Sequence, residues 1–420
     1  MWGGALEALY FFRTLSRSAI IDRRNDMEGT LKDRERVVSD GWGAWAARRE
    51  DDVMSRIAWA EFPPCTAYIN RLVSGDESKG WLEFVAGLIE KPGELGLSIC
   101  CGSGYVERQA LELGMARAME GTDISEDALE IARRSAEGLP ITYRRLDLNR
   151  DELEPGRYDF VVSAAGLHHV TNLEHCVHQL WRSLKPGGLL LMNEFVGPDR
   201  FQWTDEQLEE MNRLFVPLPV EKRHNLMTGV TSERIERRPL AYMIEADPSE
   251  AVRSSEIIGT VSLFFEPFVV REFGGTVLHP MLEGIAGNFD MEDEKDRAVV
   301  RSLIEAEERL VSSGELPADF LILAGRKRDV APADVEGLLK EGNERSAIIE
   351  RQEAEILELT RRLEEAERRN LELVDIAEGH KKEYEELKRE LELVRQKNEE
   401  LLSAGLLGRA RYAYRRLRRR

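Results

Sequence analysis

The feature that most limits the possible folds is a strand, a glycine turn and a helix that follow one another between residues 95 and 113. Leu95–Cys100 is an apolar run, Cys101-Gly102-Ser103-Gly104 has the composition of a turn, and Val106–Leu113 has helical periodicity. Such a unit leaves backbone N–H groups free at the start of the helix and lets a ligand approach the glycines closely. It predicts an α/β protein with a ligand-binding turn.

The cysteines of this turn do not indicate thiol chemistry. The chain has four cysteines, Cys65, Cys100, Cys101 and Cys176, and their spacing forms neither a C-x-x-C pair nor a disulfide framework. A reducing, cytoplasmic environment is the expectation for such a chain. No apolar run approaches the roughly 20 residues that a membrane-spanning helix needs.

Short apolar runs alternate with helical patterns from residue 94 to residue 328, which is typical of a mostly parallel sheet covered by helices. The expected strands are Leu95–Cys100, Ala118–Thr122, Ile141–Leu146, Phe160–Ala164, Leu189–Phe195, Pro267–Phe273 and Phe320–Ala324, the last two forming an antiparallel edge. The connection after the fifth strand is too long for a simple crossover. We therefore expect a helical insertion over about 200–262, with helices at Thr204–Leu214 and Ser249–Ile258, as a lid or substrate cap.

Two acidic residues extend the ligand-binding pattern. Asp123 ends the next strand after the turn, where a carboxylate can accept hydrogen bonds from both hydroxyls of a ribose. Asp147 ends the third strand, where it can accept from an adenine amino group. Glu107 occupies the place of the third glycine in G-x-G-x-x-G, which disfavours a pyrophosphate at the helix and therefore NAD.

Two further segments are YDFVVSAAGLHHV and LKPGG. Together with the glycine turn and the strands that end near Asp123 and Asp147, they resemble the class I S-adenosylmethionine-dependent methyltransferases over about residues 94–328. The resemblance implies a seven-stranded, mostly parallel Rossmann-like sheet, methyltransferase activity and S-adenosylmethionine as the cofactor. It also implies site residues: Gly102 and Gly104 along the methionine part, Asp123 at the ribose, Ile124 against the adenine, Asp147 and Leu148 at the adenine edge, and Ala164 and Ala165 facing the sulfonium.

Two positions of the expected cofactor site depart from the family pattern. Ser98 stands where the family usually has an acidic residue, and Cys100 stands where it has its first glycine. Without the acid, the hold on the cofactor's ammonium group weakens unless another residue takes its place. Cys100 distorts the turn if this position needs a positive φ. A methyltransferase-like scaffold without activity is therefore an alternative.

The histidines after the fourth strand are candidates for catalysis. His168 and His169 lie beside the expected position of the transferred methyl group, and either can act as a general base because histidine titrates near neutrality. Glu194, at the end of the fifth strand, is a further candidate, with a capping or packing role as the alternative. The nearby His175 and His178 suggest zinc, but both fall inside a predicted helix, so we expect no metal site.

A heptad pattern fills the chain after Val330. With Ile349 at position a, the frame runs without a break to Leu401. Position a holds Ile349, Ile356, Leu363, Asn370, Ala377, Tyr384, Leu391 and Asn398, and position d holds Gln352, Leu359, Ala366, Leu373, His380, Leu387, Val394 and Leu401. This predicts a coiled-coil rod of roughly 80 Å. Asn370 and Asn398 favour a parallel homodimer. A long single helix on the body is the alternative, and we expect fraying around His380.

The expected organisation is an N-terminal arm over 1–40, a methyltransferase domain over 41–330, a linker over 331–345, a coiled coil over 346–404 and a basic tail over 405–420. The net charge of −19 argues against a nucleic-acid partner, yet the tail GRARYAYRRLRRR holds seven arginines. Such a tail is expected to bind an anionic membrane surface or a membrane-bound partner. A solvated tail and an acidic protein partner are the alternatives. The expected location is the cytoplasm, peripheral at the inner face of the membrane.

A methyltransferase joined to a coiled coil and a basic tail resembles bacterial enzymes that methylate surface polysaccharides at the membrane. The resemblance implies a glycan acceptor and O-methylation of a sugar, and a small-molecule acceptor of another pathway is the alternative. Methyl transfer asks mainly for in-line positioning, with a base where the acceptor is a hydroxyl.

Overall fold

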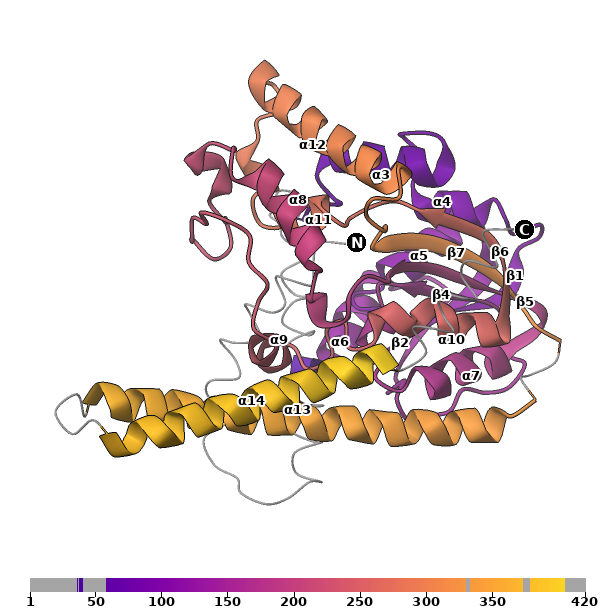
Figure 1. The fold of residues 1–420 in the computed structure, drawn as a ribbon. Coiled ribbons are helices and arrows are strands. Elements are labelled where there is room, and N and C mark those ends of the chain that lie inside the picture. Colours follow the sequence, from indigo (N-terminus) through magenta and orange to yellow (C-terminus); the bar gives the residue numbers. More distant parts are fainter. Residues whose placement is uncertain (1–35, 37, 41–57, 330–332, 373–377, 405–420) are drawn as a thin grey trace.

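Figure 1 shows the fold in a computed structural model, which describes residues 36, 38–40, 58–329, 333–372 and 378–404. The expected N-terminal arm lies almost entirely outside the described residues, and the basic tail lies wholly outside them. Within the described residues, no helix combines the length and the apolar character that a membrane crossing requires.

A seven-stranded sheet forms the centre of the molecule, in the order β3-β2-β1-β4-β5-β7-β6. Its strands are β1 (Gly93–Ile99), β2 (Ala116–Asp123), β3 (Ile141–Arg145), β4 (Tyr158–Ala164), β5 (Leu184–Phe195), β6 (Phe265–Glu272) and β7 (Phe320–Lys327). Neighbouring strands pair in parallel from β3 to β5, and β7 runs antiparallel to both β5 and β6. The expected mostly parallel sheet is confirmed, with β6 at the edge.

Successive residues of the central strands point into two separate cores, as strand geometry requires. On β4, Phe160 and Val162 join one core while Val161 joins the other. The first core is covered by α3 (Pro63–Ser74), α4 (Trp81–Ala86), α5 (Tyr105–Glu112), α11 (Leu278–Leu282) and α12 (Glu294–Ser312), the second by α7 (Leu173–Ser183) and α10 (Ile257–Phe264). Helix α6 (Glu126–Ser135) packs on β2 and β3.

The insertion between β5 and β6 holds α8 (Asp205–Phe215), α9 (Leu240–Ala246) and α10. The helix expected over Ser249–Ile258 is wrong over all but its last two residues, because regular α-helix begins only at Ile257. Ala251 has a φ of +47°, and the backbone carbonyls of residues 247, 248 and 250 accept from the Arg200 guanidinium instead of closing helical turns.

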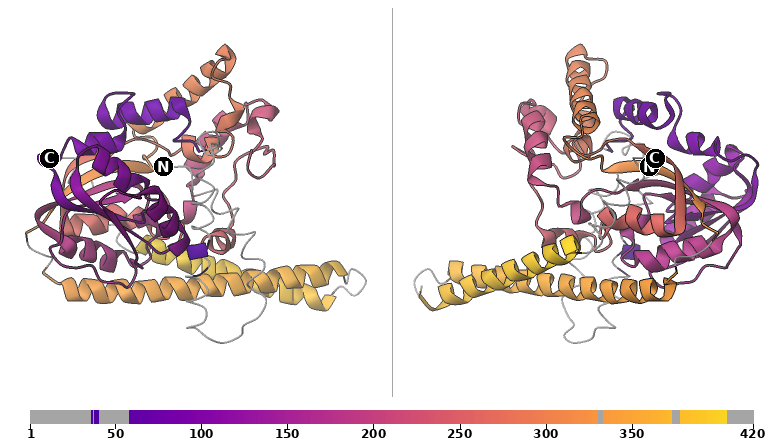
Figure 2. Two further views of the ribbon diagram at one scale, coloured as in Figure 1. Left: turned by 180° about the vertical axis from the view of Figure 1, so that it is seen from behind. Right: turned by 45° about the vertical axis from the view of Figure 1, so that its right-hand side comes forward.

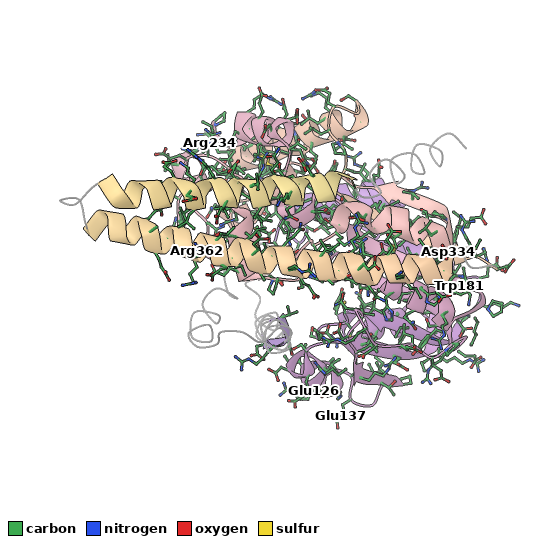
Figure 3. The ribbon with its side chains drawn as sticks, turned by 60° about the horizontal axis from the view of Figure 1, so that its bottom comes forward. Glu126, Glu137, Trp181, Arg234, Asp334 and Arg362 are labelled. Carbon is green, nitrogen blue, oxygen red and sulfur yellow. The ribbon has the colours of Figure 1, made fainter. Side chains whose placement is uncertain are left out.

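The C-terminal segment is a pair of helices and not one continuous rod. α14 (Glu378–Ala404) turns back along α13 (Val335–Glu372), and the two lie side by side in the views of Figures 2 and 3. Tyr384 contacts Glu367, and Arg362 pairs with Glu390 further from the turn, so the helices are antiparallel. The connection falls at residues 373–377, outside the described residues.

The apolar stripe predicted by the heptad frame does lie on one side of these helices. Its buried members Ile356, Leu359, Ala366, Leu387, Leu391 and Val394 form one cluster together with Ala241 and Ile244 of α9. The hairpin therefore closes the stripe within the chain, which corrects the expectation of an uninterrupted rod. The parallel homodimer stays a prediction, because the structure contains a single chain.

The expected linker over 331–345 is helical from Val335 onward, because α13 packs against α7. A Cβ at position 342 would come within 2.8 Å of the Glu174 side chain, so Gly342 allows this close approach. Asn172 donates a hydrogen bond of 2.8 Å to Asn343. Figure 3 shows α13 running from Asp334, beside Trp181, along the base of the molecule to Arg362.

Candidate active site

The glycine turn after β1 has the open backbone that the sequence predicts. Gly102 and Gly104 have φ values of +51° and +75°. A Cβ on Gly104 would lie 2.2 Å from the Tyr143 hydroxyl, so only glycine is accommodated there, whereas a Cβ on Gly102 would meet nothing within 4 Å. The space over Gly102 is therefore open to a ligand.

Cys100 adopts the conformation that a glycine would adopt with less strain. Its φ is +48°, a region that non-glycine residues rarely occupy. Its side chain is accommodated because residue 166 has no Cβ: a Cβ at Gly166 would lie 2.9 Å from Cys100 Cβ. The departure from the family pattern at Cys100 thus keeps the backbone of the turn, at the cost of local strain.

Asp123 ends β2 directly beside the turn. Its carboxylate accepts backbone hydrogen bonds from Gly102 and Ser125, each of 2.9 Å, which hold it at the carboxyl end of the sheet. Burial raises the pKa of Asp123, and the two backbone donors act in the opposite direction. Ile124, the next residue, is partly exposed.

Asp147 and Leu148 follow β3 at the same edge of the sheet, and both are buried. The Asp147 carboxylate accepts from the Asn149 backbone at 2.9 Å and from the Arg150 side chain. Ala164 and Ala165 end β4 and are partly exposed, and Ala165 has a φ of +56°. The strand ends therefore gather the expected cofactor residues on one side of the sheet.

A buried carboxylate lies where the family acid is missing. Ser98 is 1% exposed, and Glu107 of α5 is fully buried nearby. The Ser98 hydroxyl favours ionised Glu107, but burial is the larger effect and raises the pKa of Glu107 to about 7. Among the described residues, neither carboxylate oxygen of Glu107 makes a hydrogen bond of good geometry. In the sequence, Glu107 argues only against NAD, and no local pattern predicts that it lies beside Ser98.

Glu194 holds the turn that carries the two histidines. Its Oε1 accepts from the Ser163 hydroxyl at 2.7 Å and from the backbone N–H groups of Gly166 and Leu167 at 2.7 and 2.8 Å. Its Oε2 lies 2.9 Å from His168 Nδ1. Glu194 is fully buried with these contacts, which favours the packing alternative, and its catalytic role stays a prediction.

A loop of the insertion completes the surroundings of the histidines. His169 Nδ1 lies 3.2 Å from the Ser249 hydroxyl, and His168 Nε2 lies 3.5 Å from Glu250 Oε1. Arg200 donates to the backbone carbonyls of this loop and pairs with Glu353 of α13. Glu250 is 81 residues from His169 in sequence, so no local pattern could have placed it here.

The electrostatics of this cluster follow from its burial. Burial lowers the pKa of His168, but the hydrogen bond and charge of Glu194 together with the charge of Glu250 outweigh it, so the pKa is raised. For His169, burial and the neighbouring His168 lower the pKa well below its usual value. Burial raises the pKa of Glu250 to about 8. His175 and His178 stay apart, on α7.

A polar pocket opens in the insertion, next to α9. Four arginines contribute to its wall, Arg223, Arg234, Arg237 and Arg238, alongside the aromatic rings of Trp203 and Tyr242. The Arg238 guanidinium stands over the Tyr242 ring at 5.1 Å. Tyr242 lies on α9, whose C-terminal end leads directly into the loop with Ser249 and Glu250.

Comparison with known families identifies the region that carries the glycine turn. Residues 97–188 match a family described as a methyltransferase domain. This segment is therefore similar to methyltransferase domains. It contains Asp123, Asp147 and both histidines, whereas Glu194 and Glu250 lie beyond the matched residues. The enzyme class and cofactor implied by the sequence, S-adenosylmethionine-dependent methyl transfer, are supported for this domain.

Curated relatives align with about a third of the chain. A demethylmenaquinone methyltransferase of Desulfitobacterium hafniense is 29% identical over 136 residues, covering 31% of this chain and 54% of that protein. A 2-phytyl-1,4-naphtoquinone methyltransferase of Trichormus variabilis is 29% identical over 133 residues, covering 30% and 58%. The chain thus spans about half the length of the curated relatives it matches.

The solved structures that resemble the chain share little sequence identity with it, and several of them are methyltransferases. An S-adenosylmethionine-dependent methyltransferase from Mesorhizobium loti is 19% identical, covers 59% of this chain and 98% of its own, and has a TM-score of 0.35. A phosphoethanolamine N-methyltransferase of Haemonchus contortus, solved with S-adenosylmethionine, is 17% identical, covers 64% and 58%, and has a TM-score of 0.37. Likenesses this distant carry no argument about the site.

Proposed function

We propose that the whole protein is an S-adenosylmethionine-dependent methyltransferase. The observation that carries the proposal is the open turn at Gly102 with Asp123 and Asp147 beside it, inside the matched methyltransferase domain. Ligands of such sheets bind at the carboxyl ends of the strands, and all three residues lie at that edge.

The residues present suit this cofactor. The Asp123 carboxylate is held by two backbone donors and keeps lone pairs for ribose hydroxyls. We assign to Glu107 the role of the acid missing at Ser98, because a carboxylate buried in this way gains from pairing with an ammonium group. S-adenosylmethionine supplies an electrophilic methyl group when bound. The protein's own task is to orient the two reactants and exclude water.

Calorimetric titration with S-adenosylmethionine tests the proposal. Asp123→Ala should lower the affinity by at least about tenfold, since it removes the proposed ribose contact. Asp127→Ala is the matched control, because Asp127 is an exposed acid on the neighbouring helix. A parent protein that binds no cofactor would contradict the proposal and favour the non-catalytic scaffold.

For the acceptor we propose a glycan that is methylated on a sugar oxygen, with another small molecule as the alternative. The support is the arginine-lined pocket next to α9, because Arg forks hold phosphate and carboxylate groups. Trp203, Phe215 and Met281 also line this pocket, so methyl transfer to an isoprenoid quinol is the competing outcome of the test. Radiolabelled methyl transfer to nucleotide-activated sugars but not to demethylmenaquinol is the expected result. Transfer to the quinol alone would contradict it.

For the C-terminal segments we keep two proposals from the sequence. One is a homodimer through the heptad region. The other is a cytoplasmic protein held at the inner membrane surface by its arginine-rich tail, which lies outside the described residues. Flotation with anionic liposomes should fall when residues 409–420 are removed, and more so at low salt than at high salt. Equal flotation of both forms would end the membrane proposal.

A further inference from the structure

We propose that His168, His169 and Glu250 form a binding site for one divalent transition-metal ion. One ring nitrogen from each histidine and one carboxylate oxygen lie within 4.8 Å of one another. The site brings together the short helical turn after β4 and the insertion loop that follows α9. Two imidazoles and a carboxylate are a common ligand set for zinc and for non-haem iron.

The surroundings of His168 prepare one ring nitrogen for a metal. Glu194 Oε2 accepts from Nδ1–H at 2.9 Å, while Glu194 Oε1 is held by three other donors. The proton therefore resides on Nδ1, and the lone pair is on Nε2, which faces Glu250. A carboxylate that orients a ligating imidazole in this way is typical of metal sites.

His169 is prepared in the same manner by a hydroxyl. The Ser249 hydroxyl donates its proton to Asp247 Oδ1 at 2.7 Å, so it can only accept from His169 Nδ1, 3.2 Å away. This again places the proton on Nδ1 and the lone pair on Nε2. Two adjacent histidines with the same tautomer imposed from outside are hard to explain by packing alone.

Glu250 supplies the third ligand. Its side chain is fully buried, and within the described residues neither oxygen has a hydrogen-bond partner. Its Oε1 lies 3.5 Å from His168 Nε2. That separation is long for a hydrogen bond, but it is close to the roughly 3.4 Å between two ligands placed about 2.1 Å from a tetrahedral ion. A buried carboxyl group that has no hydrogen-bond partner and lies next to a ring nitrogen of His168 would be stabilised by a cation.

The position of the site gives the ion a role that rests on the proposed function. The histidine turn directly follows Ala164 and Ala165, which are expected to face the transferred methyl group. With three protein ligands, an ion keeps an open coordination position that can take an acceptor oxygen and orient it for attack. His169 is partly exposed and marks the side from which the acceptor would enter.

The test uses the full chain, purified without a histidine tag, in the absence of S-adenosylmethionine. After treatment with EDTA, the protein is titrated by calorimetry with Zn²⁺ and separately with Mg²⁺, and its metal content is measured by mass spectrometry. We expect about one Zn²⁺ per chain and no Mg²⁺ binding, because imidazole ligands favour zinc over magnesium. A parent protein that binds no Zn²⁺ would overturn the proposal and leave His168 as an imidazolium between two carboxylates.

Variants separate a metal site from a structural cluster. Glu250→Gln should weaken Zn²⁺ binding at least about 100-fold, and Glu250→Asp should retain part of it. Ser249→Ala removes only the outer partner of His169 and should weaken binding about 10-fold. His175→Gln, on α7, is the control that should change nothing. Equal Zn²⁺ affinity in the parent and Glu250→Gln would overturn the site.

The EDTA-treated protein also allows the metal proposal and the methyltransferase proposal to be tested separately. Titration of the EDTA-treated protein with S-adenosylmethionine reports cofactor binding alone. Zinc binding without cofactor binding would end the proposed function and keep the metal site. Cofactor binding without zinc binding would overturn the metal site and keep the proposed function.

Discussion

At the scale of single residues, Ser98 and Cys100 depart from the methyltransferase pattern that the sequence resembles, and the structure shows what lies beside each of them. Glu107 brings a carboxylate to the side of Ser98 from the neighbouring helix. Gly166 leaves room for the Cys100 side chain, and the backbone at Cys100 keeps the positive φ that a glycine would have. Each substitution in the turn is therefore coupled to a residue outside it.

Glu107→Gln should change binding and stability in opposite directions. Loss of the carboxylate should weaken S-adenosylmethionine binding by at least about tenfold. Since the folded pKa of Glu107 is about 7 and an ordinary glutamate has about 4.5, folding must take up a proton between these values. The parent therefore loses stability as pH rises from about 4.5 to 7, and the variant, which lacks this loss, should be the more stable one at pH 8.

Ser98→Asp in the Glu107→Gln background is the matching rescue. It returns a carboxylate from the strand side and should recover most of the cofactor affinity, while Ser98→Ala in the same background should not. Calorimetry gives the affinities, and urea unfolding at pH 5 and pH 8 gives the stabilities. If Glu107→Gln leaves the cofactor affinity unchanged, Glu107 is a buried structural acid and nothing more.

Cys100 should tolerate glycine and reject β-branched residues. Cys100→Gly relieves the strained φ of +48° and loses a small side chain, so the free energy of unfolding should stay within about 1 kcal/mol of the parent. Cys100→Val forces a β-branched residue into the same conformation and should cost more than about 2 kcal/mol. Equal stability of the two variants in urea unfolding would show that the backbone at Cys100 is not strained.

At the scale of elements, α13 and α14 form a hairpin whose apolar stripe was readable from the heptad frame. The same stripe suits two arrangements, a parallel dimer of long rods and a hairpin within one chain. The frame alone does not distinguish them, because both bury positions a and d. In the structure, Ala241 and Ile244 of α9 pack against the apolar cluster of the α13–α14 hairpin, so a third helix covers the stripe.

Crosslinking separates the two arrangements. In the hairpin, Arg362 and Glu390 are paired at 4.0 Å, whereas on one continuous helix they would stand about 42 Å apart. The double variant Arg362→Cys/Glu390→Cys, treated with a short bis-maleimide linker, should therefore give a crosslink within one chain. Asn398→Cys is the comparison, since a parallel dimer would join two copies at this position. Crosslinks between chains at position 398, with none between 362 and 390, would contradict the hairpin.

At the scale of the whole molecule, α13 is fixed to the domain by buried charges. Arg200 pairs with Glu353 of α13. Arg345 of α13 lies 2.7 Å from Glu256, and Glu256 also pairs with the buried Arg253. Arg200 also holds the carbonyls of the loop that carries Glu250. Helix α13 therefore helps to position a loop of the proposed metal site.

Glu353→Ala should destabilise the protein strongly. It leaves the Arg200 guanidinium buried without its carboxylate partner, a change that costs about 3–5 kcal/mol in comparable buried pairs. Arg361→Ala is the control on the same helix, where exposed ion pairs with Glu358 and Glu365 should matter by less than about 0.5 kcal/mol. Chemical denaturation measures both. Similar small effects of the two variants would show that the Arg200–Glu353 pair does not hold α13 to the domain.

The sequence by itself determined the sheet, the glycine turn with Asp123 and Asp147, and the apolar stripe of the C-terminal helices. These features depend on the local periodicity of apolar residues and on the residues that end the strands. Residues close together in the sequence are therefore enough to predict them. The tertiary structure alone decided that Glu107 lies beside Ser98, that Glu250 meets His168 and His169, and that residues 335–345 are helix against α7. Each of these depends on contacts between distant segments, where packing and the pairing of buried charges override local preference.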